Sequence, residues 1–92
     1  MTVPRSPVPQ EVSTELRRVV ERWHLLPLDH TLSSVPAVRS LLESLAPAEA
    51  VPDLGPGVLM DQLTVLVYDT CAREPAELDE LRGRLEALRQ SL

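Results

Sequence analysis

The stretch from Gly55 to Arg73 is the most apolar run in this chain of 92 residues. Read at 100° per residue, it has a stripe of side chains on one face, formed by Leu59, Leu63, Leu66, Val67 and Thr70. Pro56 fits the first turn of a helix, and Pro75 cannot continue one, so both ends are marked. We therefore predict a helix over residues 56–73 on which the rest of the chain packs.

The same predicted helix has a second, narrower seam on its other side. Asp61, Val65, Tyr68 and Ala72 follow the spacing i, i+4, i+7, i+11 among otherwise polar positions. A helix with apolar side chains on two faces is usually covered on both, by its own chain or by a partner. The seam is therefore a candidate contact surface.

Helical periodicity also predicts helices over residues 10–25 and 36–46. Pro27 is expected to end the first, and Pro36 to begin the second. The segment 26–35 between them is expected to be a linker whose leucines fold back onto the core, namely Leu26, Leu28 and Leu32. Residues 47–54 form a second connection, long enough for the helices on either side to cross at an angle.

The last predicted helix, over residues 75–91, carries a leucine seam. Its leucines alternate spacings of three and four along two heptads: Leu78, Leu81, Leu85, Leu88 and Leu92. Two heptads are fewer than a coiled coil needs, so the seam is interpreted as one wall of a bundle. Gly83 interrupts this helix, which suggests that another backbone approaches closely there.

These elements predict an all-α, four-helix bundle-like domain with the third helix central. A chain of this length has room for one modest core. Residues 1–9 contain three prolines and are predicted to be an extended arm, whereas residues 10–92 form the single domain. The chain carries no motif that identifies a known family.

The balance of charges argues against a nucleic-acid or membrane partner. The formal net charge is -5, and such a surface repels phosphate groups. All nine basic residues are arginine, and Lys, Asn, Ile and Phe are absent. Because the codons of these four residues are AT-rich, the composition indicates a GC-rich, bacterial gene.

One basic cluster occurs, in the first predicted helix, and consists of Arg17, Arg18 and Arg22. Glu15 and Glu21 alternate with these arginines, which is typical of a solvated helix face. A helix-turn-helix needs a three- or four-residue turn before a basic recognition helix. Here about nine residues separate the second and third helices, and the third is apolar and acidic.

The residues that could carry chemistry form no recognised catalytic or metal-binding pattern. His24, Asp29 and His30 are the best metal-ligand cluster, but their spacing matches no known motif. Asp61 and Asp69 would lie roughly 12 Å apart on a helix, too far for an acid and base pair at a glycosidic bond. The one cysteine, Cys71, is expected to be a buried thiol. We therefore expect no enzyme activity, no cofactor and no metal.

The location expected from the sequence is the cytoplasm. The chain begins with no signal peptide, and no apolar run reaches the roughly 18 residues that span a membrane. A single cysteine also gives no internal disulfide.

The function that these observations favour is a non-catalytic protein–protein interaction module, either a homodimer or the small subunit of a complex. The expected interface combines the third-helix seam with the leucine edge of the last helix and consists of Val65, Tyr68, Ala72, Leu81, Leu85 and Leu88. Tyr68 is its expected anchor, because amphipathic aromatic side chains concentrate binding energy. The alternative is a dimeric antitoxin-like or transcription-regulatory protein that contacts nucleic acid through Arg17, Arg18 and Arg22.

Overall fold

The computed structural model describes residues 8–46 and 51–92. Its four helices are α1 (Gln10–Leu25), α2 (Leu28–Leu45), α3 (Leu59–Arg73) and α4 (Leu78–Ser91). Two short 3-10 turns, η1 (Pro56–Val58) and η2 (Pro75–Glu77), lead into α3 and α4. The described residues contain no strand, so the predicted all-α, four-helix fold is confirmed.

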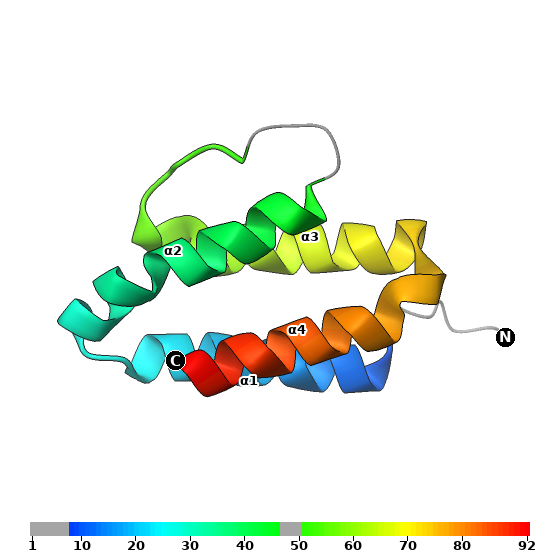
Figure 1. Ribbon diagram of the computed structural model, residues 1–92, viewed down its shortest axis with the longest axis horizontal. Coiled ribbons are helices and arrows are strands. Elements are labelled where there is room, and N and C mark those ends of the chain that lie inside the picture. Colours follow the sequence, from blue (N-terminus) through cyan, green and yellow to red (C-terminus); the bar gives the residue numbers. More distant parts are fainter. Residues whose placement is uncertain (1–7, 47–50) are drawn as a thin grey trace, which may run out of the picture.

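The helices form two layers, with α1 beside α4 and α2 beside α3 (Figure 1). The two helices within each layer run in the same direction, and the layers run antiparallel to each other (Figure 1). Because α2 and α3 are parallel, the chain must return the length of α2 before α3 can begin. This explains why the connection between them is long and is not a tight turn.

α1 begins and ends where its periodicity predicts. Pro9 precedes it with an extended backbone, and its carbonyl accepts a hydrogen bond from the Ser13 N–H at 2.9 Å. Val8 is buried, so packing against the core starts before the first helical residue. Residues 1–7 of the predicted arm lie outside the described residues.

The predicted start of α2 was wrong. The helix begins at Leu28, not Pro36, so most of the expected 26–35 linker is helical. Pro27 precedes this helix, and its carbonyl accepts the Thr31 N–H at 2.9 Å. Pro36 lies inside the helix, where its missing N–H leaves the Leu32 carbonyl without a helical partner. Leu32 and Pro36 are both exposed, so solvent can satisfy that carbonyl, and α2 bends along its length (Figure 1).

The core lies between the two layers and is made almost entirely of Leu and Val. α3 contributes six buried residues, more than any other helix. The largest fully buried side chains are Leu42, Leu59, Leu63, Leu85, Val12, Val19, Val38 and Val67. Burying one such side chain stabilises the fold by about 1.5–3 kcal/mol. The periodic apolar stripes of the sequence are thus the faces that meet here.

Polar side chains, one of them buried, also tie the helices together. Glu15 of α1 is only 7% exposed and accepts hydrogen bonds from Arg89 of α4 at 3.0 Å and from its helix neighbour Arg18 at 3.3 Å. Arg73, at the end of α3, donates to the Leu45 carbonyl at the end of α2 at 3.4 Å. A charged hydrogen bond that is shielded from water is stronger than an exposed one, so the Glu15–Arg89 contact helps to define how α1 and α4 align.

The close backbone approach expected at Gly83 does not occur. Apart from its chain neighbours and the adjacent backbone of α4 itself, no heavy atom of the described residues lies within 4 Å of a Cβ built at this position. Gly83 therefore has no steric reason to be glycine in this fold. Gly55 differs, because its φ of 91° with ψ of 165° is a conformation that only glycine adopts readily.

Candidate interaction surface

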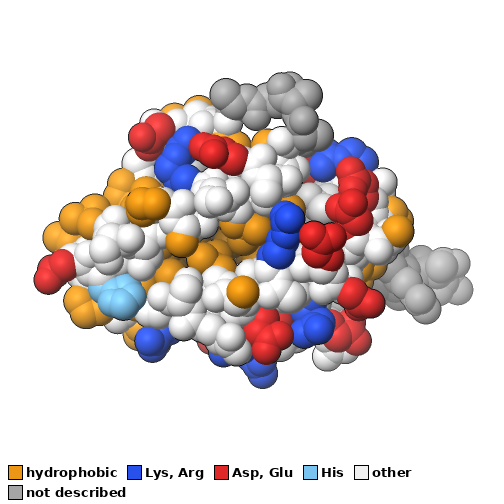
Figure 2. Space-filling view, viewed as in Figure 1, with side chains coloured by type: hydrophobic (Ala, Val, Ile, Leu, Met, Phe, Trp, Pro, Cys, Tyr) orange, Lys and Arg blue, Asp and Glu red, His pale blue; other side chains and the backbone are white. Residues whose placement is uncertain are grey.

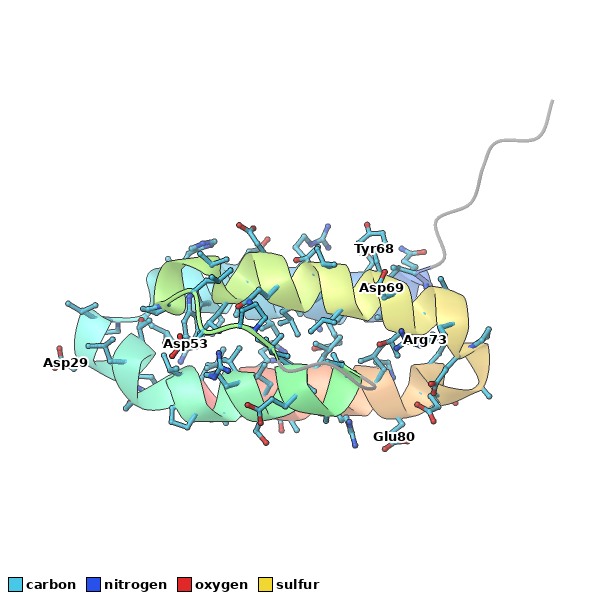
Figure 3. The ribbon with its side chains drawn as sticks, turned by 90° about the horizontal axis from the view of Figure 1, so that it is seen from above. Asp29, Asp53, Tyr68, Asp69, Arg73 and Glu80 are labelled. Carbon is cyan, nitrogen blue, oxygen red and sulfur yellow. The ribbon has the colours of Figure 1, made fainter. Side chains whose placement is uncertain are left out.

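The outer face of α3 is an exposed row of side chains, which we name the α3 face: Asp61, Val65, Tyr68 and Ala72. Val65 is 59% exposed and Tyr68 is 43% exposed, although both are large and apolar. Figure 3 shows Tyr68 pointing away from the bundle, whereas Arg73 on the same helix points toward α2. Within the described residues, nothing covers the seam that the sequence singled out.

The leucine edge of α4 has a different place. Leu81 is 2% exposed, Leu85 is 0% exposed and Leu88 is 5% exposed. These side chains belong to the core, because α1 and the α2/α3 layer cover that side of α4. The expectation that they meet a partner is therefore corrected, while the interpretation of this seam as one wall of the bundle is confirmed.

An apolar pocket of about 380 Å³ adjoins the α3 face. It lies between α3 and the segment 51–54, which we name the strap, and is lined by Ala46, Val51, Pro52, Leu54, Asp61, Gln62, Val65 and Leu66. The sequence analysis did not find this pocket. Its two walls are about ten residues apart in the sequence and meet only because the strap runs back beside α3.

Side chains from α2 and α3 hold the strap in place. Arg39 of α2 donates to the Val51 carbonyl at 3.0 Å, and Gln62 of α3 donates through Nε2 to the Pro52 carbonyl at 2.9 Å. Asp53 accepts the Gly55 N–H at 3.2 Å and lies between α2 and α3 (Figure 3). Two successive carbonyls are thus bound to opposite helices, which fixes one wall of the pocket.

A second exposed apolar patch lies where α1 joins α2, and we name it the hinge patch: Leu25, Leu28 and Leu32. These leucines are 78%, 70% and 51% exposed, and Figure 2 shows apolar side chains gathered at this end. The sequence analysis expected Leu28 and Leu32 to fold back, but the extra turns of α2 carry them beyond the core. Of the three leucines expected to fold back, which are Leu26, Leu28 and Leu32, only Leu26 packs against the core.

The arginines of the predicted nucleic-acid contact lie on the exposed side of α1. Arg18 pairs with Glu15, and Arg22 donates to the Leu92 carbonyl at 3.4 Å. Arg17 is exposed, and so are Glu11 and Glu21 on the same helix. Two of the three guanidinium groups are therefore already engaged within the chain.

The residues considered for chemistry are not brought together. His24, Asp29 and His30 are all exposed, and the described residues contain no group of three potential metal ligands. Cys71 is buried, as expected, and burial raises the pKa of its thiol. The thiol is therefore protonated near neutral pH, and it is buried whereas Tyr68 and Asp69 are exposed.

Comparisons of this chain with protein-family models, curated proteins and solved structures found no match. Over the residues that the structure describes, none of the helices combines the length and the apolar character that a membrane crossing requires. The α3 face and the strap pocket are thus the surface features of the described residues that bear on function.

Proposed function

We propose that the protein is a non-catalytic interaction module that associates through the α3 face, with a second copy of the chain as the partner. The observation that carries the proposal is the exposure of Val65 and Tyr68, side by side on a helix whose opposite side is fully packed. Exposed apolar patches on protein surfaces often mark sites of protein–protein interaction.

The spacing of the α3 face suits pairing with itself. In an antiparallel pair of α3 helices related by a two-fold axis, Val65 of each copy lies against Tyr68 of the other, and Asp61 lies against Ala72. Such an isologous contact needs only one self-complementary surface. Ala72 lets the backbones approach, and Tyr68 supplies a large amphipathic anchor. Association in the cytoplasm, as expected from the sequence, belongs to the same proposal.

The proposal is tested by measuring solution mass with light scattering over a dilution series. The wild type should give a dimer that dissociates on dilution, and Tyr68→Ala and Val65→Asp should give a monomer at the same concentrations. Leu28→Asp is the matched control, because it also places a carboxylate in an exposed apolar patch, at the other end of the molecule.

The controls separate the two exposed surfaces. Loss of the dimer in Leu28→Asp, with none in Val65→Asp, would move the interface to the hinge patch and contradict the proposal. A wild type that is monomeric at every concentration would exclude self-association through the α3 face.

A further inference from the structure

The strap pocket is apolar on its walls and acidic at its edge. Six of its eight lining residues are apolar, and the other two are Asp61 and Gln62. Asp61 is exposed and is the acidic side chain among the described residues that line the pocket. No basic side chain is among the described residues that line the pocket.

Arg39, the arginine that contacts the strap, is not among the described residues that line the pocket. Arg39 is directed at the strap backbone and at two other carboxylates, with Asp53 at 3.9 Å and Glu43 at 3.7 Å. These two acids balance its charge locally, and the Asp53 side chain is 77% exposed. The field around the pocket therefore favours cations over anions.

Gln62 also favours a ligand that carries hydrogen-bond donors. Its Nε2 donates to the Pro52 carbonyl, but its Oε1 is buried and receives no hydrogen bond from the described residues. A buried acceptor without a donor is costly, and a group that brings N–H donors would remove that cost. The Asp61 carboxylate attracts a positive charge, and the Gln62 Oε1 lacks a hydrogen-bond donor. An ammonium group supplies both the charge and the donor.

We propose that the strap pocket is a binding site for a small apolar amine. The hydrocarbon part occupies the apolar walls beside Val51 and Leu66, and the ammonium group lies at Asp61, within reach of Gln62 once the strap adjusts. A volume of about 380 Å³ is at the lower end of the range for ligand pockets, roughly 300–1,000 Å³, so the ligand is small. The pocket shares Asp61 and Val65 with the α3 face, whereas its other lining residues lie outside that face.

The test is a titration of the ¹⁵N-labelled wild type with three probes of equal chain length: n-octylamine, 1-octanol and octanoate. Octylamine should shift the backbone amide signals of Val51, Gln62 and Leu66 in a saturable way. Octanol should bind about fivefold more weakly, the factor that an exposed ion pair provides, and octanoate more weakly still.

Two pairs of variants separate charge from shape. Asp61→Asn should reduce octylamine affinity about fivefold, to that of octanol, whereas Asp69→Asn, on the same helix but outside the pocket, should not. Ala46→Leu fills the pocket and should abolish binding of both octylamine and octanol. Ala87→Leu enlarges an exposed alanine on α4, outside both the strap pocket and the α3 face, and should leave binding unchanged.

Each contrary result overturns a defined part of the inference. Octanoate binding as tightly as octylamine would refute the amine, and shifts confined to Leu25, Leu28 and Leu32 would refute the pocket. Binding that persists in Ala46→Leu would also refute it. Because Ala46 is not on the α3 face, the solution mass of Ala46→Leu should equal that of the wild type, so this result is independent of the dimer.

Discussion

Replacing Leu85 with alanine tests whether the leucine seam of α4 is core or interface. The Leu85 side chain is 0% exposed and packs among core residues of the other helices. Deleting a leucine from such a site costs about 2.7–5 kcal/mol, the lost burial plus the cavity that remains. A chain of this length is stable by only about 5–14 kcal/mol, so the substitution removes a large part of the free energy of unfolding.

The assay is urea unfolding followed by circular dichroism, with thermal melting as a second measure. We expect Leu85→Ala to melt about 11–40 °C below the wild type, since a domain of this size loses about 4–8 °C per kcal/mol. Leu32→Ala is the control: the same atoms are removed from a side chain that is 51% exposed, so its effect should stay within about 0.5 kcal/mol.

The unique Trp23 is buried in the same core and reports its unfolding by fluorescence. Both probes should give the same loss of stability. If Leu85→Ala cost less than about 1 kcal/mol and instead changed the solution mass, Leu85 would be an interface residue and the assignment of the seam to the core would be refuted.

Three further predictions concern polar and backbone features. Glu15→Gln weakens the buried pair with Arg89 and should destabilise the fold by about 1–2 kcal/mol in urea unfolding; no change would show that the pair does not contribute. Gly55→Ala should cost about 1–3 kcal/mol because Gly55 has a positive φ. Gly83→Ala should raise stability by about 0.5–1 kcal/mol because alanine has the higher helix propensity and meets no clash there. A higher melting temperature for Gly55→Ala than for Gly83→Ala would contradict this reasoning. A hydrogen bond to the Glu74 carboxyl and the charge of that group raise the Glu77 pKa above its ordinary 4.5. The folded state therefore binds this proton more tightly than the unfolded state does. The stability that the bound proton contributes is lost as the pH rises above 4.5 and Glu77 ionises. Glu77→Gln should therefore melt higher than the wild type at pH 7, with the difference vanishing toward pH 4.

Much of the secondary structure follows from apolar spacing and from proline. The boundaries of α1 follow from the spacing of its apolar residues and from Pro9 and Pro27, and the ends of α3 from its stripe and from Pro56 and Pro75. The start of α2 does not follow in this way. Pro36 is compatible with either a helix start or a position inside a helix, and in the fold it lies inside α2, where both Leu32 and Pro36 are exposed.

The sequence by itself determined which faces of the helices are apolar, and only the tertiary structure decided what covers each face. Periodicity singles out both the Leu85 seam and the Val65 seam, yet α1 covers the first and no described residue covers the second. Contacts between distant residues, such as Glu15 with Arg89, leave no periodic signal. The strap pocket also leaves no periodic signal. Its walls meet only because α2 and α3 are parallel, so the chain must return along α2 before α3 begins.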